Sequence, residues 1–276
     1  MELGLKEQLM KIIYNDYELP KGYNLSEISE NMLSNIGALD PELRDKLIYS
    51  TFHYWIIEKN FFTKEQLREI LITSLDDNHL FLKIGNKGDD SVLTRAFSVL
   101  LIPLLLIRHK HDPFLNEEDK KMVIDKVLAY FEQEKDYRGF IENKGWAHAV
   151  AHGADALDEI AKSEFVSYNE LSEMLGLIKN KVSIEDYVYV NEEDERLVTA
   201  IISIVRKGIV PDFLLVEWIN SFGDFTFPKT DLKYVNLLVN IKSFLRSLYF
   251  RMIKEEGLKH FLIEIEKILD KFSRYD

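Results

Sequence analysis

Helix-start signals recur along the chain, and they constrain its fold more than any other feature of the sequence. Asp40 followed by Pro41 combines a capping side chain with a residue whose φ is preset for the first helical turn. Thr63 and Gln66 have the spacing of a capping box, in which each side chain accepts a hydrogen bond from the other residue's backbone N–H. No segment alternates apolar and polar residues between turn dipeptides, so we expect little or no sheet. These patterns predict an all-α protein.

The scarcity of turn residues favours the same fold class. The chain has only 12 Gly and 6 Pro among 276 residues, whereas all-β and doubly wound folds need frequent turns. Apolar residues make up 46% of the sequence, with 17 Phe, 13 Tyr and 3 Trp, so the chain can fill a core and is not disordered as a whole. Long helices joined by short loops fit both observations.

Successive helical segments group into pairs joined by short connections. The expected pairs are 40–58 with 63–76, 91–109 with 116–133, 146–163 with 167–178, 194–207 with 211–221, and 231–253 with 257–273. Their starts lie roughly forty to fifty residues apart, near the repeat length of HEAT and armadillo arrays, although the repeats do not resemble one another in sequence. We therefore expect an α-α superhelix of antiparallel helix pairs, with a compact helical bundle as the alternative.

The whole chain, 1–276, is expected to form a single domain, because no low-complexity linker interrupts it. Within this domain, N-terminal helices in 1–37 are expected to cap the helix-pair array of 40–276. The segment 81–90, FLKIGNKGDD, is the expected extended loop.

Charge and residue usage argue against several classes of function. The 47 acidic and 35 basic side chains give a net charge of -12, which repels a polyanion, so we expect no nucleic-acid partner. The absence of cysteine excludes disulfides, thiolate metal sites and a cysteine nucleophile. The longest apolar run, 96–107, is about a dozen residues long, against the roughly 20 that span a bilayer. Because the N-terminus also lacks the pattern of a secretory signal, we expect a cytoplasmic protein with no membrane partner.

One stretch, Gly145 to Glu159, concentrates the polar residues that can carry chemistry. If it forms a helix at about 100° per residue, Trp146, Val150 and Leu157 share an apolar stripe. The opposite direction carries His148, His152, Asp155 and Glu159. Alanines border this polar stripe, where a solvated face would carry Lys, Glu and Gln. The pattern indicates a face that another helix or a ligand approaches closely.

Three interpretations of this stripe stay open. His148 and His152, four residues apart, can present imidazole nitrogens to one divalent metal ion, with Asp155 as the third ligand. A metal-dependent hydrolase would then use Glu159 or Glu134 as its general base. Alternatively, the side chains form a purely structural network, in which Asp155 fixes a histidine tautomer. In the third interpretation they line a groove for a protein, a peptide or a small polar molecule. No residue is assigned a catalytic role, and no cofactor other than a divalent metal is indicated.

Charged residues elsewhere are candidates for the same site. Arg95 lies inside an apolar helical run, where a buried guanidinium needs a carboxylate partner such as Asp136, Glu134 or Asp155. The alternative is an arginine that reaches solvent from a half-buried helix. The complete set of groove candidates is Arg95, Glu134, Asp136, Arg138, Trp146, His148, His152, Asp155 and Glu159.

Four stretches together resemble a known family: DPELRDKLIYSTFHYWI, GDDSVLTRAFSVLLI, EKDYRGFIENKGWAHAVAHGADALDE and NEEDERLV. The family is a mainly Gram-positive bacterial one, catalogued as domain of unknown function 2785, and the resemblance covers roughly residues 40–205. Its central signature is read here at Tyr137, Arg138, Gly139, Gly145, Trp146, Ala147, His148, Ala151, His152 and Asp155. Leu93 stands where a Phe is expected, which is a conservative apolar change.

The resemblance implies an α-α superhelical architecture and no established activity, cofactor or partner. The preferred hypothesis from the sequence is therefore a non-enzymatic helical binding or scaffold module, similar to HEAT arrays, with the polar stripe in its groove. From the net charge alone, such a module would favour a basic or amine-bearing partner.

Overall fold

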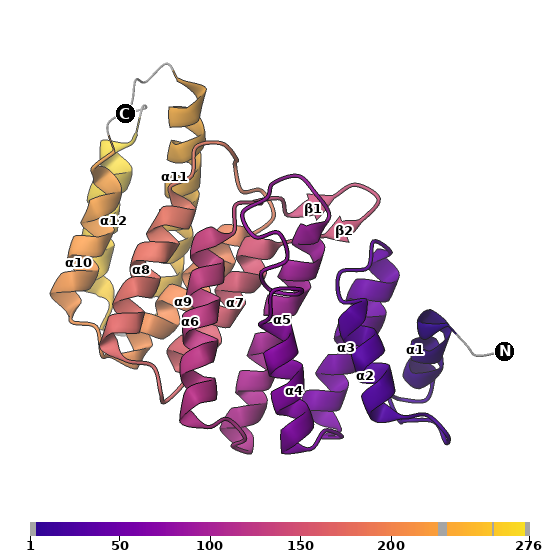
Figure 1. Ribbon diagram of the computed structural model, residues 1–276. Helices are drawn as coiled ribbons and strands as arrows, with labels where there is room; N and C mark the ends of the chain where they lie inside the picture. The colour runs from indigo at the N-terminus through magenta and orange to yellow at the C-terminus, as the bar shows by residue number, and fades with distance from the viewer. Residues whose placement is uncertain (1–3, 226–230, 256, 274–276) are drawn as a thin grey trace. The chain divides into compact units, whose positions relative to one another are not determined.

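The computed structural model describes residues 4–225, 231–255 and 257–273, and in these ranges the chain is mostly helical (Figure 1). The chain divides into two compact units, Met1–Ala156 and Leu157–Asp276, and helix α7 runs through the boundary. The all-α prediction is confirmed, because the described residues contain a single sheet of two very short strands. The prediction of one domain stays a prediction, as does the capping role of the N-terminal helices.

The first unit contains most of the residues that were singled out from the sequence. In chain order its elements are α1 (Leu5–Tyr14), α2 (Leu25–Ser34), η1 (Glu42–Tyr49), α3 (Ser50–His53), η2 (Tyr54–Glu58), α4 (Lys64–Ser74), α5 (Ser91–His111), α6 (Glu117–Gln133), β1 (Phe140–Ile141), β2 (Gly145–Trp146) and the start of α7 (Ala149–Lys162). Elements η1, α3 and η2 follow one another without a break, as the predicted helix 40–58 requires, although η1 and η2 are π-helical.

The second unit is helical throughout its described residues. After the end of α7 it contains α8 (Tyr168–Val182), α9 (Glu193–Lys207), α10 (Asp212–Asn220), the short 3-10 turn η3 (Ser221–Gly223), α11 (Leu232–Met252) and α12 (Lys259–Lys271). Helix α11 packs against α9 and α12. These bounds match the predicted helix pairs of this part of the chain to within a few residues.

Local capping chemistry explains why the helices begin where they do. The predicted capping box of Thr63 and Gln66 is present at the start of α4, and Ser167 with Glu170 forms another at α8. The carboxylate of Asp40 accepts the backbone N–H of Glu42 at 2.9 Å. Each of these contacts satisfies an N–H group that the first helical turn leaves free.

The long apolar helix α5 forms the core of the first unit. It packs against α4 and η2, and it contains the apolar run 96–107. Among the described residues it is the one helix long and apolar enough to cross a bilayer, and 78% of its apolar window is buried within the fold. Burial of this kind is what a core helix of a soluble protein shows.

Segment 81–90 is a loop, as predicted, but it consists largely of consecutive turns where an extended loop was expected. Gly85 and Gly88 adopt positive φ values of 85° and 82°, a region that glycine enters without steric cost. This loop connects α4 to α5 and lies beside the residues that follow α6 (Figure 1).

The end of α5 provides a test of the fold. Nδ1 of the buried His109 accepts backbone N–H groups from Phe114 at 3.0 Å and Leu115 at 3.1 Å. Burial lowers the pKa of His109 below its usual 6.5, and the nearby Lys120 and Lys64 lower it further. The folded state therefore favours neutral imidazole, whereas the unfolded state takes up a proton near pH 6.5.

We expect the free energy of unfolding to fall as the pH drops from about 6.5 toward the lower pKa of folded His109. Urea unfolding followed by circular dichroism at pH 7.5 and at pH 5.5 measures this. His109→Asn, which removes the titrating ring, should weaken the pH dependence. His111→Asn, at an exposed histidine of the same helix end, should leave it as in wild type. Equal pH dependence in wild type and His109→Asn would contradict the assignment.

Candidate functional site

The stretch predicted as a helix from residue 146 begins with a hairpin instead. Strands β1 and β2 pair antiparallel, with Phe140 opposite Trp146 and Ile141 opposite Gly145. His148 has a φ of 52°, and α7 begins only at the next residue. A left-handed residue interrupts a right-handed helix, so the helical-wheel position predicted for Trp146 and His148 is wrong. His152, Asp155 and Glu159 do lie on α7.

A buried arginine from η1 fixes the backbone of this hairpin. Arg44 is fully buried, and it donates hydrogen bonds to the carbonyl oxygens of Ala38 at 2.6 Å, Lys144 at 2.6 Å and Trp146 at 3.1 Å. Its Nε lies 2.8 Å from a carboxylate oxygen of Asp45. Burial lowers the pKa of Arg44, and the Asp45 carboxylate opposes this effect.

Gly145 shows how tightly η1 and the hairpin fit together. Its φ is 75°, and a Cβ atom placed on it would lie 2.8 Å from the Cβ of Pro41 and 3.2 Å from an Nη atom of Arg44. Both the backbone conformation and the available space therefore require glycine here. Arg44 was not among the predicted site residues, although it lies on the same side of the predicted helix as Ile48 and Trp55, where a charge is unexpected.

Five rings form a continuous row from the hairpin surface into the core, and we call them the aromatic row. Ring centroids are 5.0 Å apart for Phe140 and Trp146, and 4.4 Å apart for the stacked Trp146 and His148. They are 5.9 Å apart for His148 and His152, and 5.3 Å apart for His152 and Phe97. Exposure falls along the row, from 56% for Phe140 and 40% for Trp146 to 8% for His152 and 3% for Phe97.

Two corrections follow from the aromatic row. Trp146 was predicted to anchor the core, but it is exposed, because it belongs to the hairpin and not to α7. The inner end of the row is closed by Arg44, whose guanidinium carbon lies 4.9 Å from the ring centroid of Phe97. The same arginine therefore supports both the hairpin backbone and the rings behind it.

His152 is a buried ring with a backbone partner. Its Nδ1 lies 3.1 Å from the carbonyl oxygen of Ala96, which can only accept, so Nδ1 carries the proton. Its ring packs against Phe97 nearly perpendicularly. Among the described residues, no group of three or more His, Asp or Glu side chains is placed to hold a metal ion.

Most of the other residues predicted on this helix are either buried in the interior or held by ion pairs within α7. The alanines that border the predicted polar stripe, Ala149, Ala151, Ala154 and Ala156, are buried. A Cβ atom on Gly153 would lie 2.8 Å from the ring of Phe131, so this helix approaches α6 closely. Glu159 forms an ion pair with Lys162 at 2.7 Å, and Asp155 is partly buried.

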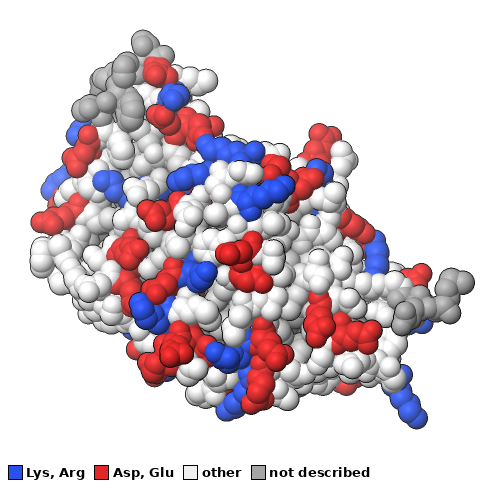
Figure 2. All heavy atoms as spheres, in the orientation of Figure 1, with Lys and Arg blue, Asp and Glu red and all other residues white. Residues whose placement is uncertain are grey.

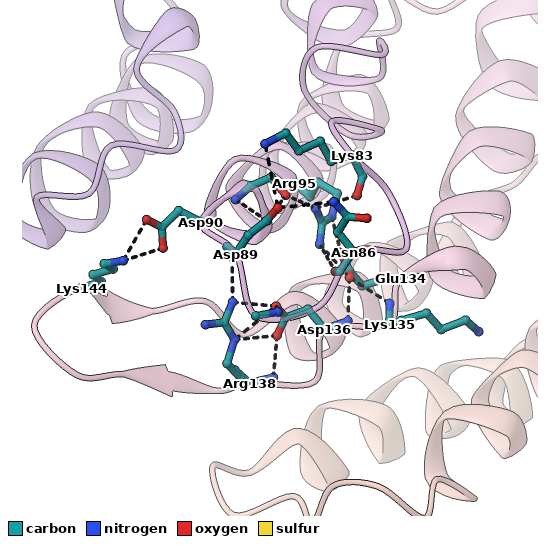
Figure 3. A network of polar contacts seen from close by, with 12 residues as sticks. Lys83, Asn86, Asp89, Asp90, Arg95, Glu134, Lys135, Asp136, Arg138 and Lys144 are labelled. Atoms are coloured by element: carbon teal, nitrogen blue, oxygen red, sulfur yellow. Dashed lines mark hydrogen bonds and ion pairs between the residues drawn. The ribbon is translucent and has the colours of Figure 1, made fainter.

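The four remaining candidates form a second cluster, at the end of α6 (Figure 3). Arg95 is fully buried and pairs with the buried Glu134, with N–O distances of 2.6 Å and 2.9 Å. Burial disfavours the charge of Arg95, but the hydrogen bonds to Glu134 and the nearby carboxylates outweigh it and raise its pKa. Glu134 is thus the carboxylate partner that a buried Arg95 requires.

The same cluster fixes loop 81–90. Arg95 donates to the carbonyl oxygens of Leu82 at 2.9 Å and Asn86 at 3.4 Å. The carboxylate of Asp136 accepts the backbone N–H of Gly88 at 2.8 Å. We call Arg95, Glu134, Asp136 and Arg138 the loop cluster, since its members hold this loop against α5 and α6 (Figure 3).

Arg138 completes the loop cluster at its outer side. Its Nη2 contacts the carboxylate of Asp136 at 2.6 Å and the carbonyl oxygen of Asp89 at 2.7 Å, and its Nε contacts Asp136 at 2.8 Å. Its own carbonyl oxygen accepts the backbone N–H of His148 at 3.2 Å. Seven of the nine predicted groove residues therefore belong to two neighbouring groups, the loop cluster and the aromatic row, which are linked through this backbone contact. Asp155 and Glu159 belong to neither group.

Substitution of His152 tests whether this ring is structural. His152→Ala should lower the free energy of unfolding by about 2 kcal/mol or more, because it opens a cavity and removes the donor to Ala96. Trp146→Ala, at an exposed ring of the same row, should cost clearly less. Urea unfolding of both variants measures the difference. Metal analysis of untagged protein is the second readout, and stoichiometric metal lost in His152→Ala would contradict the structural role.

Comparisons with known proteins give a family and no further relatives. A family model described as "Protein of unknown function (DUF2785)" matches residues 80–250, which include the loop cluster, the hairpin and α7. No curated protein and no solved structure shows a significant match to the chain. Because the matched segment covers well over half of the sequence, the chain belongs to the DUF2785 family.

Proposed function

We propose that this protein is a non-enzymatic binding module whose contact surface is the hairpin of residues 140–146. The supporting observation is the pair of exposed aromatic rings on it, Phe140 and Trp146, which pack edge to face. Aromatic side chains are enriched where proteins bind partners, since they offer a large apolar area at a small cost in side-chain entropy. The partner is a protein, a peptide or a small polar ligand.

The rigid support of the hairpin strengthens this proposal. Arg44 holds two of its carbonyl oxygens, and Lys144 forms an ion pair with Asp90 at 2.6 Å. Trp146 also stacks on His148, so its ring cannot turn freely. A surface already fixed in one conformation loses little entropy on binding, and more of its contact energy contributes to affinity.

The helices would serve as the scaffold for this surface. We take the antiparallel helix pairs to stack into a HEAT-like superhelix, supported by their number and by starts roughly forty to fifty residues apart. We also take the protein to be a bacterial one of the cytoplasm, which is compatible with the burial of α5 and with a cysteine-free sequence. Family membership brings no activity with it, so the proposal depends on the hairpin.

The metal-dependent hydrolase with His148, His152 and Asp155 stays a prediction that gains little from the geometry. The Nδ1 atom of His152 donates a hydrogen bond to a backbone carbonyl oxygen, and its ring packs between His148 and Phe97. A structural role is better supported for this residue. The histidines then support the binding surface indirectly, because Trp146 stacks on the ring of His148, which in turn contacts His152.

Selection from a peptide display library against the full chain tests the binding function. Peptides selected on wild-type protein should bind Trp146→Ala at least about tenfold more weakly, a loss typical of a central aromatic contact. Fluorescence anisotropy of the labelled peptides measures the affinities. Phe213→Ala removes an exposed aromatic ring from α10 and serves as the matched control. Selected peptides that bind wild type and Trp146→Ala equally well would exclude the hairpin as the contact surface.

A further inference from the structure

Basic side chains gather beside the hairpin, although the protein as a whole is acidic. Lys83 and Lys87 come from the loop before α5, and Lys135 and Arg138 follow α6. The three lysines are exposed and Arg138 is partly exposed. Figure 2 shows several blue side chains in the region where Figure 1 draws this loop, with red side chains beside them. We call these four residues the basic loop surface.

Two acidic residues of these segments point inward, whereas Asp89 and Asp90 of the loop are partly exposed. Glu134 and Asp136 alternate with Lys135 and Arg138 in the sequence, but both carboxylates are buried. Glu134 faces Arg95, and Asp136 faces Arg138 and the backbone of the loop (Figure 3). Residues 134–138 are therefore neutral in sequence but present the cationic side chains of Lys135 and Arg138 to solvent. In the loop, Asp89 lies 3.9 Å from Lys83, Asp90 pairs with Lys144, and the exposed Lys87 is a further cation of this surface.

Arg138 has a donor group that the protein does not use. Its Nε and Nη2 atoms are held by Asp136 and by the carbonyl oxygen of Asp89, whereas Nη1 makes no hydrogen bond or ion pair within the described part of the chain. Figure 3 shows this nitrogen facing away from the other residues drawn. A guanidinium that is already oriented binds a carboxylate with a small additional loss of entropy.

We propose that the basic loop surface docks an acidic segment of a partner protein, with an aromatic residue of that segment on the hairpin. This inference rests on the proposed binding function and specifies its partner. Carboxylates of the segment meet Arg138, Lys135 and Lys83, while its aromatic ring meets Phe140 and Trp146. Phe140 follows Arg138 by two residues, about 7 Å in extended chain, so one short peptide reaches both.

The distribution of charge favours a short acidic peptide over a nucleic acid. The net charge of -12 repels a long polyanion, whose phosphates would run beyond the basic loop surface. At physiological ionic strength, charges farther away than about 8 Å are largely screened, so a short segment interacts mainly with the local lysines and Arg138. The net charge alone favoured a basic partner, and the local surface reverses that preference.

Fluorescence anisotropy with three labelled peptides on the full chain tests the partner. Each peptide carries one phenylalanine, flanked by glutamates in the first, glutamines in the second and lysines in the third. We expect the glutamate peptide to bind at least about tenfold more tightly than the glutamine peptide, and this preference should shrink as salt is added. A single-stranded oligonucleotide is the fourth probe.

Charge reversal locates the binding. Lys135→Glu and Lys83→Glu should each weaken binding of the glutamate peptide by roughly fivefold or more. Lys121→Glu changes the net charge equally on α6, about 20 Å from Lys135 along the chain direction, and should have less than about a twofold effect. The side chains of Lys83 and Lys135 are both exposed, so both variants should fold, and circular dichroism checks this.

The outcomes separate the two proposals. If the glutamine peptide binds as tightly as the glutamate peptide and loses affinity in Trp146→Ala, the hairpin is a binding surface but the acidic partner is wrong. If Lys121→Glu weakens binding as much as Lys135→Glu, the basic loop surface is not the docking site. An oligonucleotide that binds more tightly than the glutamate peptide, and loses affinity in Lys135→Glu, would overturn the proposal in favour of nucleic acid.

Discussion

The hairpin, the aromatic row and the packing of η1 all depend on the buried guanidinium of Arg44. Removing such a charge from water costs several kcal/mol, and the structure offsets this cost with three carbonyl oxygens, the Asp45 carboxylate and the ring of Phe97. Loss of any one partner would leave the charge under-compensated. The arrangement therefore stabilises one position of the hairpin and disfavours others, which is what a binding surface requires.

A second buried arginine, Arg95, fixes loop 81–90 in a similar way. Arg95 is neutralised by Glu134, and its remaining donors are used to hold the carbonyl oxygens of loop 81–90. Since Asp136 and Arg138 extend the pairing to the surface, the loop is fixed from the interior outward. The two arginines thus hold the hairpin and the loop in defined conformations through contacts to backbone carbonyl oxygens.

The helices could be predicted from the sequence because their signals are local. Thr63 and Gln66 cap α4 through contacts three residues apart, and such a spacing is visible in the chain itself. The hairpin could not be found in this way, because each strand has only two residues and because the helical periodicity of α7 extends back to Trp146 in the sequence. What ends it is the positive φ of His148.

The candidate site was located only in part for a related reason. The carboxylate partner of Arg95 was anticipated, since a charge inside an apolar run requires one. Arg44, in contrast, donates to a carbonyl oxygen 100 residues later in the chain. Every residue has such a backbone acceptor, so the sequence does not indicate which one Arg44 contacts. The basic loop surface was missed because its cations come from two separate segments, and because Lys135 and Arg138 alternate with acidic residues that turn inward.

A single turn of α5 connects these features. Arg95 holds the loop, the carbonyl oxygen of Ala96 receives His152, and Phe97 contacts both His152 and Arg44. Three consecutive residues thereby join the loop, the start of α7 and the support of the hairpin. A shift of this turn would disturb all three together. If the hairpin and the basic loop surface bind as proposed, binding at one that moves this turn would change the affinity of the other, by the same factor in each direction.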